Sequence, residues 1–170
     1  MRTETPVTIY LDQYTPPAWW VDTVDLVIAI HDDHARVTAD LHVRRNLGVP
    51  AAALWLDGEA LQLESVTVDG AALDASAYSL SEKGLSLPLA GDAAHITTVV
   101  RIEPDKNTAL SGLYRSKDGY FTQCEAEGFR RITYYPDRPD VMAKFTCRLE
   151  ADQSRFPQLL ANGNPVGAGE

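Results

Sequence analysis

The sequence has no apolar stretch long enough to cross a membrane. Its longest run without Asp, Glu, Lys or Arg covers residues 156–169, and prolines and glycines interrupt that run. A membrane-spanning helix needs about 20 predominantly apolar residues. The first residues, Met1–Pro6, are polar, and the apolar core of a secretory signal does not follow them. We therefore expect no membrane partner and a cytoplasmic location.

The sequence also has few basic residues and few cysteines. Lysine and arginine number 15 against 24 aspartates and glutamates, so the formal net charge is −9. A nucleic-acid-binding surface needs a basic footprint, so this balance argues against a nucleic-acid partner. The two cysteines, Cys124 and Cys147, are too few for a disulfide framework and are not spaced as zinc-finger ligands. Cys147 lies in an alternating run and is expected to be a small core residue.

Metal-binding patterns are equally scarce. The zinc signature His-Glu-x-x-His is absent, and the chain has four histidines, namely His31, His34, His42 and His95. His31 and His34 could in principle hold a metal ion with the two aspartates between them. A polar hairpin turn explains the same residues, and we favour the turn. We predict no metal site in this chain.

What the sequence does contain is period-two alternation of apolar and polar residues. Apolar side chains occupy every second position in 24–30 and 37–43, which is the pattern of half-buried strands. Asp69-Gly70 is a favoured hairpin turn. Further short strands are expected at 60–68, 77–80, 85–87, 96–102 and 143–151. Because no helical period extends over a helix-length window, the chain is predicted to be all-β: an antiparallel multi-strand sandwich or a curved, saddle-like β domain.

The two ends of the chain are predicted to differ from its middle. Residues 1–21 carry several prolines and aromatic residues and predict an extended arm, and residues 22–170 predict the β domain. Residues 159–166 have the pattern of a strand that runs into a turn at Asn162-Gly163. The partner strand would lie beyond Glu170. We therefore expect the β domain to be truncated within a C-terminal hairpin.

The alternation stops in residues 107–145, where aromatic and charged residues gather. A connection of this length without a strand period is usually functional or disordered, and its aromatic residues argue against disorder. From the residues alone, a binding site and a packed surface loop both remain open. Arg130 could contact Glu125, although the sequence does not identify its acidic partner. Local ion pairs that hold the loop are expected from Asp137, Arg138 and Asp140.

This segment carries a resemblance to a known family. Its residues resemble the N-terminal β domain of aminopeptidase N, a family of zinc-dependent exopeptidases, and in particular its proteobacterial branch. The broader family usually has Asp-Glu-Pro where this chain has Asp137-Arg138-Pro139, so no role is carried over to Arg138. The matching residues are Leu113-Tyr114-Arg115-Ser116, Gln123-Cys124-Glu125-Ala126, Arg130, Asp137-x-Pro139, Ala143-x-Phe145 and 154–164.

The resemblance implies a function for the parent protein and a role for this chain. The parent would be a zinc aminopeptidase that removes N-terminal residues from peptides. Glu125 would accept hydrogen bonds from the α-ammonium group of the peptide substrate, since a carboxylate is the natural acceptor for that group. Gln123 would line the pocket for the first side chain. The zinc and the catalytic residues would belong to a catalytic domain that is missing here, so the isolated chain is expected to be inactive and free of zinc.

Two readings without this role remain. A stand-alone β-sandwich module that binds carbohydrate or a protein partner would show a complete strand set at its C-terminus and a platform of exposed aromatic side chains. In a purely structural interaction domain, Glu125 and Gln123 would bind no ligand. Glu125 would be a solvated glutamate and Gln123 a surface amide.

Overall fold

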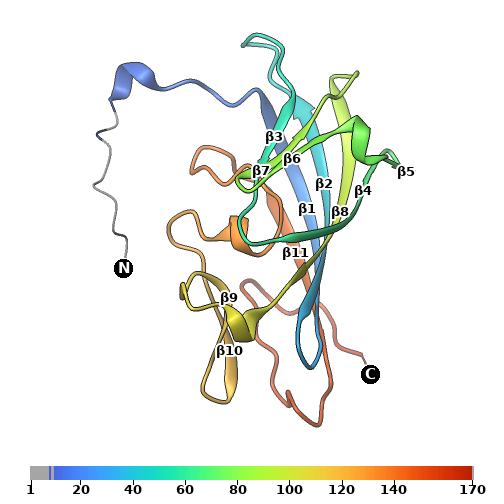
Figure 1. The fold of residues 1–170 in the computed structure, drawn as a ribbon, viewed down its shortest axis with the longest axis vertical. Coiled ribbons are helices and arrows are strands. Elements are labelled where there is room, and N and C mark those ends of the chain that lie inside the picture. The colour runs from blue at the N-terminus through green and yellow to red at the C-terminus, as the bar shows by residue number, and fades with distance from the viewer. Residues whose placement is uncertain (1–7, 9, 170) are drawn as a thin grey trace.

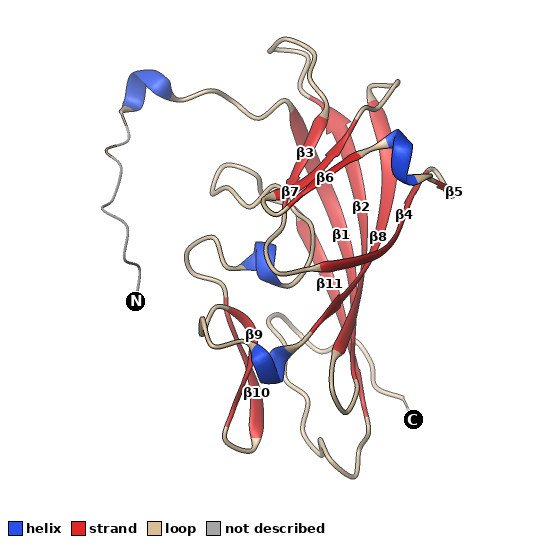
Figure 2. Cartoon of the chain, viewed as in Figure 1, coloured by secondary structure: helices blue, strands red, loops and turns tan. Residues whose placement is uncertain are grey.

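The structure, a computed structural model, describes residue 8 and residues 10–169. This part of the chain contains eleven β-strands, four short 3₁₀-helices and no α-helix (Figure 2). None of its helices is long and apolar enough to cross a membrane. The prediction of an all-β fold is confirmed.

The largest element is a six-stranded sheet with the strand order β11-β1-β2-β8-β4-β5 (Figure 1). Period-two burial along β1 and β2 shows that one face of this sheet is packed and the other is open to solvent. Its strands are β1 (Trp19–Ile30), β2 (Ala35–Arg45), β4 (Gln62–Val68), β5 (Ala71–Ala72), β8 (Ala93–Ile102) and β11 (Lys144–Ala151).

Two smaller sheets and four single-turn helices complete the part of the chain that the structure describes. The three-stranded sheet has the order β3-β7-β6, and the two-stranded sheet is the hairpin β9-β10. The strands are β3 (Leu54–Asp57), β6 (Ser79–Ser81), β7 (Gly84–Leu87), β9 (Gly112–Ser116) and β10 (Gly119–Gln123). The 3₁₀-helices are η1 (Leu11–Gln13), η2 (Ala75–Ala77), η3 (Pro104–Lys106) and η4 (Phe129–Arg131).

Two turns named from the sequence form as expected. β1 and β2 form a hairpin in which the backbone N–H of His31 donates to the carbonyl of His34 at 2.9 Å, so the turn interpretation of these histidines is confirmed. Asp69 and Gly70 connect β4 to β5 with φ angles of 52° and 80°. Both lie in the left-handed region, which a tight two-residue hairpin of this kind requires.

β11 departs from the antiparallel pattern. It runs parallel to β1, from Thr23 opposite Lys144 to Ile30 opposite Ala151. Every other strand pairing in the described part of the chain is antiparallel. Period-two alternation is the same in both cases, so the sequence could not distinguish them.

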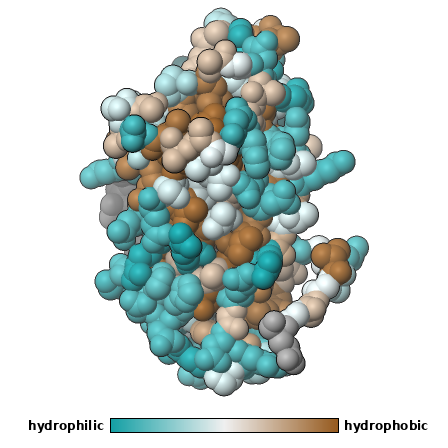
Figure 3. All heavy atoms as spheres, turned by 90° about the vertical axis from the view of Figure 1, so that its right-hand side faces the viewer, coloured by the Kyte–Doolittle hydropathy of each residue, from teal (hydrophilic) through white to brown (hydrophobic). Residues whose placement is uncertain are grey.

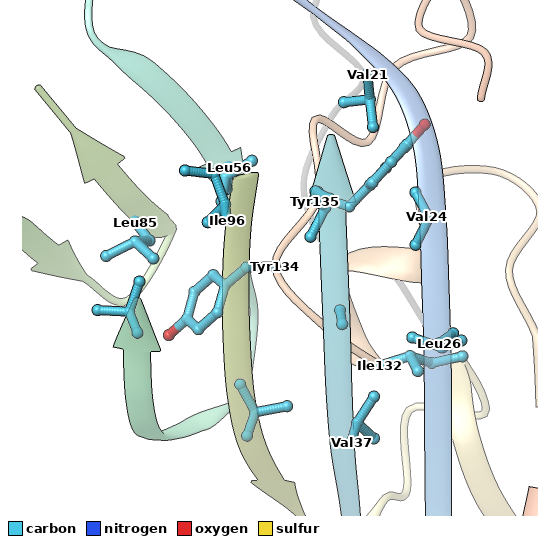
Figure 4. Packing of buried hydrophobic residues seen from close by; sticks show 14 of the residues in the cluster. Val21, Val24, Leu26, Val37, Leu56, Leu85, Ile96, Ile132, Tyr134 and Tyr135 are labelled. Carbon is cyan, nitrogen blue, oxygen red and sulfur yellow. The ribbon is translucent and has the colours of Figure 1, made fainter. Parts of the chain in front are cut away.

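The core lies between the six-stranded sheet and a second layer. That layer consists of the three-stranded sheet and the segment 129–141. In Figure 4, Ile132 lies beside Leu26 of β1, and Tyr134 and Tyr135 point in opposite directions. The largest fully buried apolar side chains are Leu41, Leu54, Leu56, Leu85, Leu87 and Ile96. Burial of each such side chain contributes about 1.5–3 kcal/mol relative to exposure, so this interface holds the layers together.

The tryptophans at the start of β1 are structural. Trp19 is 4% exposed, and its indole N–H donates to the carbonyl of Ala52 at 2.9 Å. Trp20 lies under the guanidinium of Arg44 at 6.0 Å. Of the arm expected over 1–21, residues 1–7 and 9 lie outside the described part of the chain, and residues 19–21 belong to β1.

Two local expectations differ from the structure. Residues 159–166 form no strand, since the described chain offers them no partner, and truncation of the domain within a C-terminal hairpin stays a prediction. Cys147 is exposed rather than buried. It lies on the edge strand β11, most of which is exposed, so the second layer does not cover it.

The outer surface is mixed in character. The face drawn in Figure 3 carries hydrophilic side chains interleaved with smaller hydrophobic groups. On the solvent side of β2 and β8, the rings of His42 and His95 stack with centroids 4.3 Å apart. Asp40 lies beside them, with its Oδ1 3.5 Å from Nε2 of His95.

Candidate functional site

The two residues assigned to substrate binding lie together at the end of the β9–β10 hairpin. Gln123 is the last residue of β10, and Glu125 lies in the short loop 124–128 that leads into η4 (Figure 1). We call residues 124–128 the Glu125 loop. The side-chain amide of Gln123 donates to the backbone carbonyl of Glu125 at 3.1 Å. Both side chains are exposed, and the Glu125 carboxylate has no hydrogen bond or ion pair within the described part of the chain.

The Glu125 loop is closed at its base by a backbone hydrogen bond. The N–H of Gly128 donates to the carbonyl of Cys124 at 2.8 Å. A Cβ at position 128 would lie 2.7 Å from the carbonyl oxygen of Gln123 and 2.8 Å from the Cα of Cys124. Only glycine permits this approach of two backbone segments. The peptide bond between Glu125 and Ala126 is cis.

Cys124 is not set up as a nucleophile. Its side chain is partly buried against the core. Burial, helped by the negative charge of Asp137, raises the pKa of the Cys124 thiol. A reactive cysteine needs a lowered pKa, so the environment here favours a structural thiol.

Arg130 and Asp137 form the main polar contact beside the loop. One carboxylate oxygen of Asp137 accepts hydrogen bonds from Nε and from the backbone N–H of Arg130, at 3.0 and 3.1 Å. Nη2 of Arg130 donates to the Asp137 carbonyl at 2.9 Å. Burial lowers the pKa of Arg130, but the hydrogen bond to Asp137 and the surrounding carboxylates outweigh it and raise the pKa above its usual value. The partner of Arg130 that the sequence left open is therefore Asp137, not Glu125.

Asp57, at the end of β3, fastens this segment to the small sheet. Its Oδ2 accepts the backbone N–H of Asp137 at 3.0 Å, and its Oδ1 accepts the indole N–H of Trp55 at 3.0 Å. Its backbone exchanges two hydrogen bonds with Tyr135, at 2.8 and 3.1 Å. Asp57 could not be identified from the sequence, because no local pattern marks a contact of such long range.

Arg138 and Asp140 hold the next part of the segment to the N-terminal arm. Nε and Nη2 of Arg138 each donate to one carboxylate oxygen of Asp140, both at 2.7 Å. Nη2 of Arg138 also donates to the carbonyl of Thr15 at 2.8 Å, and the hydroxyl of Tyr14 donates to Asp140 at 2.9 Å. The local ion pairs expected from Asp137, Arg138 and Asp140 are confirmed. The contact of Arg138 with the carbonyl of Thr15 could not be predicted from the sequence.

A cluster of aromatic rings packs around the residue that follows the Glu125 loop. The ring of Phe129 makes edge contacts with Tyr135 and Phe145, at centroid distances of 5.2 and 5.7 Å. Burial, with the charge of Asp137, raises the pKa of Tyr135 to about 12, so its hydroxyl stays protonated. Phe145 remains 49% exposed. The residues directly after the Glu125 loop are thus anchored by both packing and charge.

The described residues do not offer a zinc site. No group of three or more His, Cys, Asp or Glu side chains in residues 8 and 10–169 is arranged to hold a metal ion. The stacked His42 and His95, with Asp40 beside them, do not form such a group. A catalytic zinc site needs at least three protein ligands directed at one ion, so these residues are not assigned to zinc.

Comparison with known proteins identifies the family. The model of the Peptidase M1 N-terminal domain matches residues 21–168. The chain is 47% identical over 169 residues to aminopeptidase N of Caulobacter vibrioides and 40% identical over 168 residues to aminopeptidase N of Escherichia coli. Each alignment covers 99% of this chain and 19% of the relative. The chain therefore spans about a fifth of the length of these curated relatives.

Solved structures agree with the sequence relatives. Legionella pneumophila aminopeptidase A, solved in complex with aspartic acid, is similar with a TM-score of 0.83 and 32% identity. That alignment covers 90% of this chain and 18% of the Legionella chain. An M1 zinc metallopeptidase from Deinococcus radiodurans shares the fold with a TM-score of 0.66 at 16% identity. The resemblance to the N-terminal domain of proteobacterial aminopeptidase N is confirmed, and the chain belongs to the Peptidase M1 N-terminal domain family.

Proposed function

We propose that this chain is the N-terminal domain of a cytoplasmic zinc aminopeptidase, and that Glu125 anchors the α-ammonium group of the peptide substrate. The observation that carries the proposal is the state of the Glu125 carboxylate. It is exposed at the tip of a loop whose base is fixed, and no described residue competes for it. The proposal also draws on the resemblance carried by Gln123-Cys124-Glu125-Ala126.

The chemistry of the substrate explains why a carboxylate is needed. A free peptide N-terminus offers three N–H donors and a positive charge, which a blocked or internal peptide lacks. A charge-assisted hydrogen bond to a carboxylate is about twice as strong as a neutral one. The Legionella relative was solved in complex with aspartic acid. An amino acid carries an α-ammonium group, which is the group that Glu125 binds in this proposal. Gln123, whose amide is tied to the Glu125 carbonyl, lines the first side-chain pocket in this proposal.

The role of this chain in the proposed enzyme is confined to binding. Zinc in a peptidase polarises the scissile carbonyl and activates water. Because the described residues lack a ligand set for zinc, we place its ligands in the rest of the protein. The isolated chain would then neither hydrolyse peptides nor need the metal.

A sugar-binding module receives less support. Such a module would present exposed aromatic rings as a platform. Trp19 is buried, and Trp20 is covered by Arg44. The adjacent tryptophans therefore act as anchors of β1.

The test is steady-state kinetics of the full-length protein on an aminoacyl chromogenic substrate. Truncating one partner of a buried charge pair costs about 3–5 kcal/mol. At about 1.4 kcal/mol per decade, Glu125→Ala is expected to lose roughly two to four powers of ten in kcat/KM. Glu125→Gln keeps an acceptor and is expected to lose less. Zinc content should be equal in all variants.

The matched control is Asp118→Ala. Asp118 is an exposed carboxylate in the turn of the same β9–β10 hairpin. Its removal is expected to leave kcat/KM within twofold. A Glu125→Ala enzyme within threefold of wild type would remove the anchor role. Equal losses for the two variants would do the same, because they would indicate general damage to the hairpin.

A further inference from the structure

The Glu125 loop has few contacts of its own with which to hold its carboxylate in place. Glu125, Ala126 and Glu127 are all exposed. The hydrogen bonds within the loop are the Gly128-to-Cys124 closure and the bond from Gln123 to the Glu125 carbonyl. Segments with few buried contacts open locally at low cost. The position of the carboxylate therefore depends on what fixes the two ends of the loop.

The N-terminal end is fixed by the last rung of a short hairpin. Gln123 pairs with Gly112, and the residue after it, Cys124, is partly buried. Leu113 of β9 is buried in the core, so packing holds the hairpin in place. The oriented polar contacts next to the loop lie at its other end.

The C-terminal end of the loop is followed by Phe129 and then by Arg130, whose side chain is only 23% exposed. Three hydrogen bonds join Arg130 to Asp137, and the Asp137 side chain is 13% exposed. Asp137 is in turn held by the Asp57 carboxylate through its backbone N–H. The carbonyl of Arg130 accepts the N–H of Glu59 at 2.9 Å. Each contact is oriented, so Arg130 is held in one place on the end of β3.

A further contact reaches from Arg130 back into the loop. The carboxylate of Glu127 lies 3.7 Å from Nη2 of Arg130. Asp137 therefore orients a guanidinium that attracts the loop two residues after Glu125. Asp137 itself has no contact with the Glu125 side chain among the described residues.

We infer that Asp137 is a positioning residue for substrate binding: by holding Arg130, it fixes the Glu125 loop so that the Glu125 carboxylate meets the substrate ammonium group. This inference rests on the proposed function of Glu125. A misplacement of about 1 Å at a binding group can cost on the order of a hundredfold in rate. Loss of the Asp137 charge should therefore weaken recognition of the ammonium group without removing any group that touches the substrate.

The experiment is a double-mutant cycle in the full-length protein with Glu125→Ala, Asp137→Asn and the double variant. Asparagine keeps the size and an oxygen acceptor, so Asp137→Asn removes mainly the charge. It is expected to lower kcat/KM by roughly tenfold to a hundredfold. The double variant is expected to match Glu125→Ala within about twofold, because residues that act through one another are not additive. Asp92→Asn is the control, since Asp92 pairs with Arg45 at 2.9 Å and contacts neither the loop nor Arg130.

A second readout separates positioning from general damage. Inhibition is measured with alanine hydroxamate and with propionohydroxamate, which differ only by the amino group. Asp137→Asn and Glu125→Ala should both reduce the preference for the amino compound, whereas Asp92→Asn should keep it. Thermal unfolding of every variant checks folding. Should Asp137→Asn fail to fold, Arg130→Lys keeps the cation, loses the planar fork and takes its place in the cycle.

The outcomes are distinct. A fully active Asp137→Asn beside an impaired Glu125→Ala overturns this inference and leaves the proposed function standing. Losses that multiply in the double variant also overturn it, because Asp137 would then act independently of Glu125. A fully active Glu125→Ala overturns the proposed function and this inference together.

Discussion

Asp57 and Asp137 lie 80 residues apart in the sequence, and the carboxylate of the first accepts the backbone N–H of the second at 3.0 Å. This bond joins the end of β3 in the small sheet to the segment that leads into β11. The backbone of Tyr135 forms two further hydrogen bonds with the backbone of Asp57. Hydrogen bonds therefore connect the small sheet to the segment that holds the Glu125 loop. A shift of β3 would move Asp137 and, through it, Arg130.

The first prediction concerns Gly128. Gly128→Ala would place its Cβ 2.7–2.8 Å from backbone atoms of Gln123 and Cys124, which cannot move without opening the loop. Overpacking of this kind costs about 1–3 kcal/mol in unfolding free energy. Urea denaturation of the two proteins measures the loss. Gly167→Ala is the control, because nothing lies within 4 Å of the added Cβ there. Equal stability of both variants and the wild type would contradict the crowding.

The second prediction is that the isolated chain binds no zinc tightly. Its described histidines, cysteines and carboxylates form no cluster of three or more ligands, and a tight zinc site needs at least three protein ligands. Equilibrium dialysis followed by metal analysis measures the binding, with the tag removed. One equivalent of zinc that survives a weak chelator would refute the prediction.

The third prediction is a pH dependence that Asp140 contributes. The hydrogen bond from Arg138 holds the pKa of the Asp140 carboxyl below its usual value. A group whose pKa is lowered on folding stabilises the fold above its unfolded pKa, near 3.9 for Asp, and loses that contribution as the pH falls through the folded pKa. Asp140→Asn should therefore cost up to about 1 kcal/mol at pH 7, and this cost should shrink as the pH falls below the unfolded pKa toward the lower folded pKa.

Urea denaturation at pH 7, 5 and 3 measures this difference for the wild type and the variant. Asp12→Asn serves as a control, because Asp12 lies on the exposed η1 and forms no ion pair within the described part of the chain. A difference between wild type and Asp140→Asn that stayed constant from pH 7 to pH 3 would show that the Arg138–Asp140 pair has no role in it.

The long strands were predictable from the sequence because their burial is periodic. β1, β2 and β8 each carry several alternating positions, and the sequence placed all three. β3, β9 and β10 have four or five residues each and were not placed, although β6 and β7 are as short and were. The position of β3 depends on its pairing with β7, a distant segment, and no local pattern records that pairing. β9 and β10 pair with each other, but the alternation of apolar and polar residues is absent from that segment.

The candidate site, too, could be predicted from the sequence only in part. Gln123 and Glu125 came from a resemblance carried by consecutive residues, and the structure places them together, at the end of β10 and in the loop that follows it. The partner of Arg130 could not be chosen from several nearby acids, because an ion pair depends on three-dimensional distance. Cys147 was misplaced because alternation assigns a face of the sheet but does not indicate how far the second layer extends.

The parallel pairing of β1 with β11 makes the order of synthesis matter. Thr23 pairs with Lys144, so nearly the whole domain must be made before the edge of the large sheet can close. Contacts of such long range slow folding, since loop-closure entropy is paid before the strands can pair. A nascent chain that ends before residue 144 leaves β1 as an open edge, and open strand edges are where chains aggregate. During translation, the hairpins can form early, but the complete sheet is among the last structures to appear.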